Sequence, residues 1–306
     1  MTTEQLLKNL EVPTGKVDVV LDTDTYNEID DQFAAAYLLN YGEKLNVKGI
    51  CAAPFHNARS TSPADGMERS YREIFKLLKL AGREDLYDAV YAGSREYLPD
   101  EQTPVESPAA RFMAELSKRY SPEKPLYIVA IGAITNVASA LLLEPEMKES
   151  VVIVWLGGTA HHCHRNDEFN LMQDIAAARI VFGCGVPLVQ LPCWGVVDRF
   201  TTTEFELKHW LQGRNALCDY LVNNVLEETA KYAAGKPWSR VIWDVTAVAW
   251  LVNENGQFFE SELRHSPIPE YDKRWAFDNH RHFMRYVSAV NRDALMEDLF
   301  DRVSRS

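Results

Sequence analysis

Five acidic side chains lie close together near the start of the chain, directly after a run of apolar residues. The stretch VDVVLDTDTYNEIDDQFA (residues 17–34) contains Asp22, Asp24, Glu28, Asp30 and Asp31. Carboxylates at this density disfavour one another's ionised form unless a positive charge lies among them. Because carboxylate oxygens suit Ca²⁺ or Mg²⁺ far better than Zn²⁺, the cluster predicts a site for a hard divalent cation. A solvated acidic turn that caps a helix is the alternative interpretation.

The spacing of these residues predicts how their side chains point. Asp22 and Asp24 are two residues apart at the end of an expected strand, so both leave the same face. Asp30 and Asp31 lie where the next helix should begin, and a helix N-terminus favours negative charge. Neighbouring residues on a helix diverge by about 100°. One aspartate can therefore face the strand-end carboxylates while its neighbour faces a ligand.

The elements that would position this cluster are indicated by apolar runs that alternate with helix-period segments. The strand-length runs are residues 17–21, 46–53, 125–131, 151–158 and 186–192. Continuous apolar strands separated by helices indicate an α/β fold with a mostly parallel sheet that helices cover on both faces. Sites in such sheets lie at the carboxyl ends of the strands. The pairs Ser62-Pro63 and Ser107-Pro108 predict two helix starts.

The last third of the chain has a different pattern. Residues 200–235 look helical, residues 253–285 look irregular with short strands, and RDALMEDLFDRV (292–303) predicts a closing helix. No repeat or linker separates these parts, so we expect one domain over residues 1–306.

Composition excludes several classes of partner. The chain has 306 residues, 46% of them hydrophobic, and a net charge of −12 without a Lys/Arg block. Nucleic acid and anionic membranes, which demand a basic surface, are therefore poor candidates. The N-terminus lacks a secretory signal pattern, and no apolar stretch is long enough to span a membrane. Five scattered cysteines without a C-x-x-C pair favour reduced thiols in the cytoplasm and no zinc motif.

Two families share the opening pattern. Four apolar residues followed by DTDT match the first motif of haloacid-dehalogenase-like phosphohydrolases, but the acidic pair that such enzymes place late comes at once here. The chain resembles the inosine-uridine-preferring nucleoside hydrolases over most of its length. Five segments in the right order carry this resemblance: DTDTYNEIDD, CAAPFHNARS, YIVAIGAITNVASAL, VWLGG with EFNLMQDIAAA, and VIWDVTAVAWL.

The resemblance implies a metal centre and a general base. Ca²⁺ would be held by Asp24, Asp31, Asp244 and the backbone carbonyl of Ile131. Asp24 would also be the general base for the attacking water. A carboxylate-rich ribose site of this kind stabilises the positive charge that develops on the sugar as an N-glycosidic bond breaks.

The resemblance also implies a set of residues that bind the sugar. Asp30 would hold the ribose 2′-hydroxyl, and Asn57, Glu168 and Asn170 would bind the remaining hydroxyls. Glu168 and Asn170 are two residues apart, so an extended segment would direct both toward the sugar. Their alternative role is to cap the helix that follows.

This sequence departs from the family pattern at two places. The acidic loop is two residues longer, so Asn27 or Glu28 can reach the sugar or the metal. The histidine that precedes the last metal ligand in many members is Trp243, and an indole cannot protonate a leaving base. We therefore expect Trp243 to stack on the base, which favours purine or modified-purine nucleosides. His162 and His164, in the loop after an expected strand, are candidates for the missing acid.

The sequence thus predicts a cytoplasmic, Ca²⁺-dependent N-ribohydrolase that splits a ribonucleoside into base and ribose. By resemblance, a homodimer or homotetramer is favoured. The alternatives are a haloacid-dehalogenase-like phosphohydrolase and a catalytically silent protein that binds nucleosides or sugars.

Overall fold

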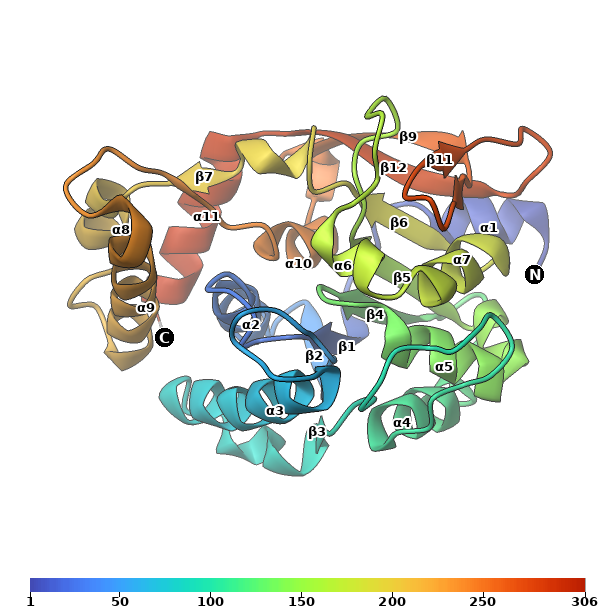
Figure 1. The fold of residues 1–306 in the computed structure, drawn as a ribbon, viewed down its shortest axis with the longest axis horizontal. Coiled ribbons are helices and arrows are strands. Elements are labelled where there is room, and N and C mark those ends of the chain that lie inside the picture. The colour runs from blue at the N-terminus through green and yellow to red at the C-terminus, as the bar shows by residue number, and fades with distance from the viewer. Residues whose placement is uncertain (306) are drawn as a thin grey trace.

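A sheet of eight strands runs through residues 1–305, the part of the chain that the computed structural model describes (Figure 1). Its strands lie in the order β3-β2-β1-β4-β5-β6-β12-β9. All neighbours are parallel except the edge pair β12 and β9, which is antiparallel. Their bounds are β1 (Val17–Thr23), β2 (Leu45–Ala52), β3 (Val90–Tyr91), β4 (Leu126–Ala130), β5 (Val151–Leu156), β6 (Leu188–Leu191), β9 (Phe259–His265) and β12 (Phe283–Val290). The expected mostly parallel α/β fold is confirmed.

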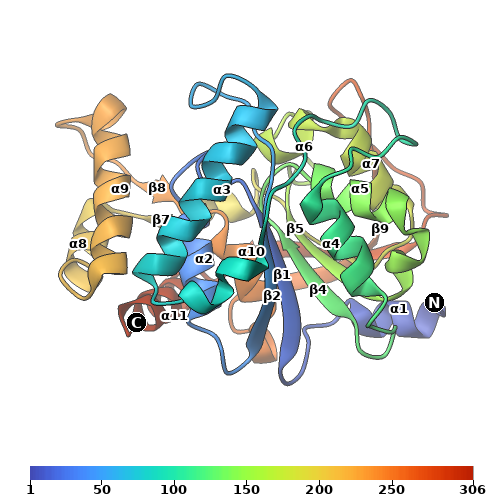
Figure 2. The same cartoon turned by 90° about the horizontal axis from the view of Figure 1, so that it is seen from below.

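Helices cover both faces of this sheet (Figure 2). On one face α2 packs against α10 and α11, and on the other α5 packs against α4 and α7. The helices are α1 (Thr3–Asn9), α2 (Asp31–Leu39), α3 (Pro63–Leu80), α4 (Pro108–Ser117), α5 (Thr135–Leu143), α6 (Phe169–Gln173), α7 (Ile175–Gly183), α8 (Glu204–Trp210), α9 (Ala216–Ala233), α10 (Val245–Trp250) and α11 (Arg292–Ser304). Two short pairs, β7 (Thr201–Thr202) with β8 (Arg240–Val241) and β10 (Ile268–Pro269) with β11 (Trp275–Ala276), lie outside the main sheet.

The central strand β1 fixes the acidic loop that follows it. Its last five residues are buried, as expected of a strand covered on both faces. It pairs with β2 on one side and β4 on the other, so that Asp22 lies opposite both Cys51 and Ala130. Ladder hydrogen bonds continue past its end, from Ile131 N to the Asp22 carbonyl (2.9 Å) and from Ala53 N to the Thr23 carbonyl (2.8 Å). The backbone that carries the first carboxylates is therefore held from both sides.

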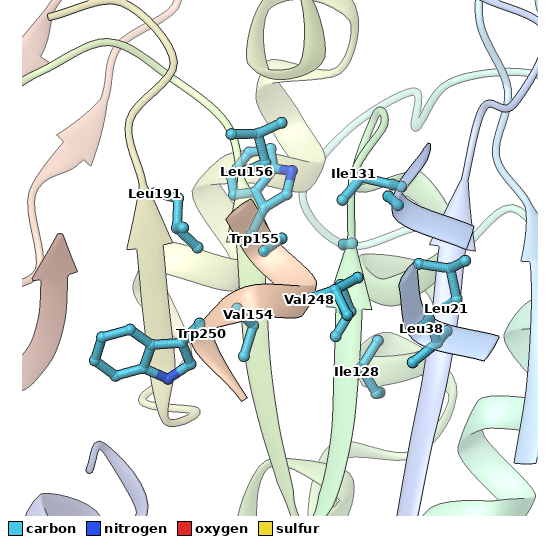
Figure 3. Close-up of a cluster of buried hydrophobic side chains, with 14 of the residues drawn as sticks. Leu21, Leu38, Ile128, Ile131, Val154, Trp155, Leu156, Leu191, Val248 and Trp250 are labelled. Carbon is cyan, nitrogen blue, oxygen red and sulfur yellow. The ribbon is translucent and has the colours of Figure 1, made fainter. Parts of the chain in front are cut away.

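The short helix α10 is the second rigid support of the site. Every one of its residues is buried, and it packs against α2 and the strands β4 and β5. Figure 3 shows Val248 and Trp250 of this helix among apolar side chains from the central strands. This burial anchors Asp244, which lies directly before the first helical residue.

Local sequence signals explain several helix starts. The hydroxyl of Ser62 accepts a hydrogen bond from Asp65 N at the start of α3, and that of Ser107 accepts one from Ala110 N at the start of α4. Each is followed by proline at the first helical position, so both predicted starts are confirmed. Across residues 1–305, no helix has the length and apolar character needed to cross a bilayer.

Two predictions for the last third of the chain were incomplete. Residues 200–235 are not one helix but β7, α8 and α9, because Gly213 adopts positive φ and Asn215 then caps α9. Residues 253–285 contain the expected short strands, β10 and β11, but also β9 and the start of β12, which are longer and pair with each other in the main sheet.

Candidate active site

Three buried carboxylates meet where α2 and α10 begin. One oxygen each from Asp30, Asp31 and Asp244 lies within 4.8 Å of the other two. Asp30 and Asp244 immediately precede α2 and α10, and neither side chain caps its own helix. Both helix N-termini therefore direct their positive dipole ends at the same small volume, which favours negative charge there.

Asp24 lies beside this trio but is not one of its three closest members. Its side chain is fully buried, and a Cβ added to Gly132 would lie 3.0 Å from its carboxyl carbon. Burial raises its pKa well above the usual range, and the charges of Asp31 and Asp30 raise it further. The structure thus brings together Asp24, Asp31 and Asp244, as expected, but adds Asp30 to the innermost group.

Burial also raises the pKa values of the other three carboxyl groups. Burial raises the pKa of Asp31 to about 6, opposed by a hydrogen bond from the Thr23 hydroxyl. Burial, then Glu28 and Asp31, raises the pKa of Asp30, and burial with Asp30 and Asp31 raises that of Asp244. Burial and mutual repulsion therefore both disfavour ionisation of these carboxyl groups.

A metal ion fits this donor set. Among the described residues, neither carboxylate oxygen of Asp24 and only one of Asp31 has a hydrogen-bond partner, although all are buried. Buried oxygens without donors are costly unless a ligand satisfies them. The atoms here that could coordinate a metal are all oxygens, which Ca²⁺ and Mg²⁺ prefer. The acidic cluster can therefore bind a divalent cation.

Asp22 takes a different part in the arrangement. Its Oδ1 accepts a hydrogen bond of 2.8 Å from Nδ2 of Asn136, which also bonds the Ala52 carbonyl. Burial raises its pKa to about 7. Through Asn136, Asp22 therefore links the end of β1 to α5 and to the end of β2.

A pocket of about 320 Å³ opens above the cluster, a volume in the range of small-molecule sites. The buried side chains that line it, its floor, are Asn27, Asp30, Ile131, Leu156, Glu168, Asn170, Cys193 and Asp244. The more exposed ones, its rim, are Glu28, Phe169, Trp194, Tyr232, Ser239, Arg240, Val241 and Trp243. The floor is buried, whereas Trp194 and Tyr232 are 55% and 58% exposed. The pocket thus runs from a dry acidic end to an aromatic rim.

Glu168 and Asn170 lie at this floor, but both are already hydrogen-bonded. The carboxylate of Glu168 accepts from the backbone N–H groups of Gly158, Asn170 and Leu171, at 2.7 to 3.0 Å. It is therefore the N-cap of α6, the alternative role considered from the sequence. Asn170 Nδ2 donates to the carbonyls of Leu156 (3.0 Å) and Ile131 (3.3 Å), which fixes the carbonyl expected to face the metal.

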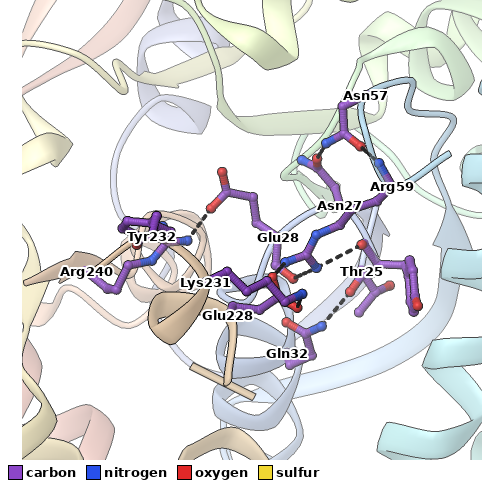
Figure 4. A network of polar contacts seen from close by, with 11 residues as sticks. Thr25, Asn27, Glu28, Gln32, Asn57, Arg59, Glu228, Lys231, Tyr232 and Arg240 are labelled. Atoms are coloured by element: carbon purple, nitrogen blue, oxygen red, sulfur yellow. Dashed lines mark hydrogen bonds and ion pairs between the residues drawn. The ribbon is translucent and has the colours of Figure 1, made fainter. Parts of the chain in front are cut away.

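The long acidic loop is tied to the segment that carries Asn57. Asn57 Nδ2 donates to Asn27 Oδ1 at 2.6 Å, and Arg59 Nη1 donates to the Glu28 carbonyl at 3.2 Å (Figure 4). Asn57 borders a neighbouring hollow that shares Asn27, Glu28, Tyr232 and Arg240 with the main pocket. These hydrogen bonds therefore hold the acidic loop against the segment that carries Asn57.

Trp243 lines the pocket and packs edge-on against Trp194, with ring centroids 5.2 Å apart. The histidine loop lies differently. His162 and His164 are exposed and do not line this pocket within the part of the chain that the structure describes. His161 is instead packed among Trp275, Phe277 and Tyr286 and bonds Gln190. The structure does not bring His162 and His164 together with the other site residues, and their catalytic role stays a prediction.

Sequence reasoning missed three residues of the rim, namely Trp194, Tyr232 and Arg240. Arg240 Nη2 donates to Glu28 Oε2 at 2.6 Å, so the extra carboxylate of the longer loop binds an arginine (Figure 4). The one available signal was that Arg240 lies four residues before Asp244. Trp194 and Tyr232 lie in a loop and at the end of α9, where no pattern marks them.

The family model described as inosine-uridine preferring nucleoside hydrolase matches residues 19–296. The probable uridine nucleosidase 2 of Arabidopsis thaliana is 29% identical over 197 residues, covering 56% of this chain. That alignment spans 57% of the length of the relative, so less than two thirds of it. The non-specific ribonucleoside hydrolase RihC of Salmonella paratyphi B is 27% identical over 78% of this chain and 79% of its own.

Solved structures share the fold. The purine-preferring ribonucleoside hydrolase from Gardnerella vaginalis superposes with a TM-score of 0.74 at 20% sequence identity, over 94% of this chain and 98% of that one.

Proposed function

The chain belongs to the inosine-uridine preferring nucleoside hydrolase family, and we propose that it hydrolyses the N-glycosidic bond of a ribonucleoside to a free base and ribose. The family match sets aside the phosphohydrolase alternative. The observation that carries the proposal is the buried carboxylate cluster. Asp30 and Asp244 line a nucleoside-sized pocket, and oxygens of Asp24 and Asp31 lack hydrogen-bond donors.

We propose Ca²⁺ as the cation, held by Asp24, Asp31, Asp244 and the Ile131 carbonyl. The support is the donor set, which consists of carboxylate and carbonyl oxygens from several segments, as flexible Ca²⁺ coordination prefers. When bound, the ion supplies Lewis-acid activation of the attacking water and neutralises the carboxylates. Asp30 lies close enough to share this role, so it either joins the ligands or holds the 2′-hydroxyl, as the resemblance implies.

The residues of the chain divide the remaining work. Asp24 accepts the proton of the water that attacks the anomeric carbon. The buried acidic floor stabilises the positive charge that develops on the sugar. Asn170 and Asp30 orient the ribose from this floor, with Asn57 approaching from the adjoining hollow. Trp243 and Trp194 offer ring faces and edges to the base, which favours purine-like substrates.

A panel of ribosides tests this function. The protein with Ca²⁺ is incubated with inosine, guanosine, adenosine, uridine, cytidine and an activated 4-nitrophenyl riboside, and free ribose is measured as reducing sugar. We expect ribose release, fastest from the purine nucleosides. Absence of ribose from every substrate would contradict the proposal. Ligand-dependent thermal stabilisation without ribose release would instead identify the catalytically silent binder. Organisation as one domain, assembly as a homodimer or homotetramer, and a cytoplasmic location stay predictions.

A further inference from the structure

A single arginine forms the cationic part of the pocket rim. Arg240 opens β8 and lines the pocket with 21% of its side chain exposed. Its Nη2 donates to Glu28 Oε2 at 2.6 Å, and its Nη1 donates to the Tyr232 hydroxyl at 3.0 Å (Figure 4). Two partners, Glu28 far away in the sequence and Tyr232 eight residues before Arg240, thus hold the guanidinium in place. An arginine fixed in this way loses less conformational freedom on binding a ligand.

This guanidinium has donors to spare. Arginine carries five N–H donors in a rigid plane. The two hydrogen bonds to Glu28 and Tyr232 use two of them, and Nε is buried without a partner among residues 1–305. Because arginine does not deprotonate in proteins, it can donate hydrogen bonds but cannot supply a proton. Its chemistry at this position is therefore recognition and charge stabilisation.

The depth profile of the pocket decides which part of a nucleoside meets Arg240. The carboxylates of Asp30 and Asp244 lie at the buried floor, and a sugar with hydroxyl groups is the part of a nucleoside that they can bind. A ribose seated there directs its base toward the rim, where Trp243 and Trp194 flank the opening. Arg240 is the cationic side chain in this lining.

We propose that Arg240 is the specificity-determining residue for the departing base, and that it selects 6-oxopurine ribosides over 6-aminopurine ribosides. A 6-oxopurine presents two acceptors, O6 and N7, on one edge, which match the paired donors of a guanidinium. Adenine presents an amino donor in place of O6 and so loses one of the two bonds. This inference rests on the proposed function and names the class of substrate for that same site.

The contact also assists the bond-breaking step without a proton transfer from the arginine. As the C1′–N9 bond breaks, its electron pair passes to the base, and negative charge spreads over the ring to N7 and O6. Hydrogen bonds from Arg240 to that edge would stabilise the charge as it forms. Water supplies the hydroxyl group to C1′, and the proton that it releases to Asp24 returns through solvent to the base. Arg240 would thus stabilise the departing base although Trp243 cannot protonate it.

Glu28 acts as a positioning residue for Arg240. It lies in the acidic loop that is two residues longer than the family pattern, and Arg59 fixes that loop by bonding the Glu28 carbonyl. The alternative is that Glu28 and Arg240 form an ordinary surface ion pair with no role in specificity. The Glu28 side chain is half exposed, and such pairs contribute only about 0–1 kcal/mol to stability. A structural pair would affect all substrates alike, whereas a positioning pair changes the ratio between bases.

The test compares kcat/KM for four substrates in the Ca²⁺-loaded protein: inosine, 7-deazainosine, adenosine and 4-nitrophenyl riboside. In Arg240→Met, which keeps a long side chain but no donor, kcat/KM for inosine should fall about 10- to 100-fold, since one good arginine–base pair gives ~1–3 kcal/mol of discrimination and 1.4 kcal/mol is tenfold. Adenosine should fall much less, and the nitrophenyl riboside should not change. The ratio of kcat/KM for inosine to that for 7-deazainosine should be smaller in Arg240→Met than in the wild type, because the variant lacks the guanidinium that would bond N7.

Arg179→Met is the matched control. Arg179 pairs with Glu101 at 2.6 Å and its side chain is 23% exposed, close to the values for Arg240, but it does not line the pocket within residues 1–305. Its inosine-to-adenosine ratio should equal that of the wild type. Glu28→Gln, which retains an acceptor for Arg240, should lower the ratio less than Arg240→Met does, and it serves as the second variant if Arg240→Met folds poorly.

Each remaining outcome is decisive. An inosine-to-adenosine ratio that is the same in wild type, Arg240→Met and Glu28→Gln would overturn the role of Arg240 while leaving the hydrolase intact. Equal losses on all four substrates would also overturn it and identify a structural ion pair. A wild-type protein that splits neither the nucleosides nor the nitrophenyl riboside would instead overturn the hydrolase proposal, and this inference with it.

Discussion

Replacing one buried carboxylate should stabilise the metal-free protein. In Asp31→Asn, the amide oxygen can still accept from the Thr23 hydroxyl, and the amide nitrogen can donate to Asp244, with which Asp31 already shares a hydrogen bond. The substitution therefore keeps the local hydrogen bonds and removes one negative charge from among three neighbours. In most proteins the loss of a buried polar group is destabilising, so the expected sign is unusual.

The magnitude follows from the pKa of Asp31. Burial raises this pKa from 3.8 to about 6. At 1.36 kcal/mol per pKa unit, ionising Asp31 in the metal-free fold costs about 3 kcal/mol at pH 8. A change of that size corresponds to roughly 6 °C in the unfolding midpoint of a protein this large, at about 2 °C per kcal/mol.

The sign of the pH dependence is also fixed. A carboxyl group with a raised folded-state pKa gives stability that is complete below the unfolded pKa and is lost as the pH rises through the folded value. The midpoint of the chelated wild type should therefore rise as the pH is lowered from 8 through 6, helped by Asp22, whose pKa is about 7. Ca²⁺ at about 100 times its Kd should restore ~2.7 kcal/mol at pH 8, and Asp31→Asn should respond weakly.

Thermal unfolding of chelated and Ca²⁺-loaded samples at several pH values measures these effects. Asp272→Asn is the control, because Asp272 is exposed and distant from the cluster in the sequence. It should change neither the midpoint nor the response to Ca²⁺. A chelated Asp31→Asn protein that unfolds at a lower temperature than the chelated wild type at pH 8 would refute the argument from charge repulsion.

The remaining predictions concern turnover and packing. Asp24→Asn should lose ~10²–10⁴-fold in kcat because an amide is not a useful base; near-full activity would show that another carboxylate takes the proton. Trp243→Ala should cost ~1–3 kcal/mol in transition-state binding of purine nucleosides, and Trp243→Phe less; uridine turned over as fast as inosine, with no effect of Trp243→Ala, would exclude stacking. His162→Ala and His164→Ala should leave kcat nearly unchanged, whereas slow turnover of nucleosides alone, with the nitrophenyl riboside spared, would identify an acid. Gly93→Ala should lower the unfolding midpoint, since its Cβ would lie 1.8 Å from the Ala52 carbonyl oxygen; an unchanged midpoint would contradict that close approach.

The sheet could be predicted because its strands are continuous apolar runs. Residues 19–21 and 151–156 are apolar without alternation, which is the pattern of strands buried on both faces, and both lie in central strands. The antiparallel edge strand β9 was not predicted. Its sequence, FESELRH, is charged and half exposed, because an edge strand needs little apolar surface and benefits from charges that block further pairing.

The floor of the site was easier to predict than its rim. Carboxylates that directly follow a buried parallel strand are expected to lie at the carboxyl edge of the sheet. Asp24, Asp30 and Asp31 do lie there, near Asp244. Arg240 contacts both Glu28 and Tyr232 only because the end of α9 and the short strand β8 come together near the acidic loop. No periodicity encodes a contact between residues 28 and 240, since it depends on tertiary packing.

The order in which the cluster is completed has a consequence for folding kinetics. Asp244 follows Asp31 by 213 positions in the chain, and it joins the other carboxylates only when α10 packs against α2. We expect this contact to form late in folding, after β1 and β2 pair, because it requires the closure of a long loop. Interactions made after the transition state slow unfolding without speeding folding. A bound cation should therefore lower the unfolding rate, and so lengthen the lifetime of the native state, while leaving the refolding rate almost unchanged.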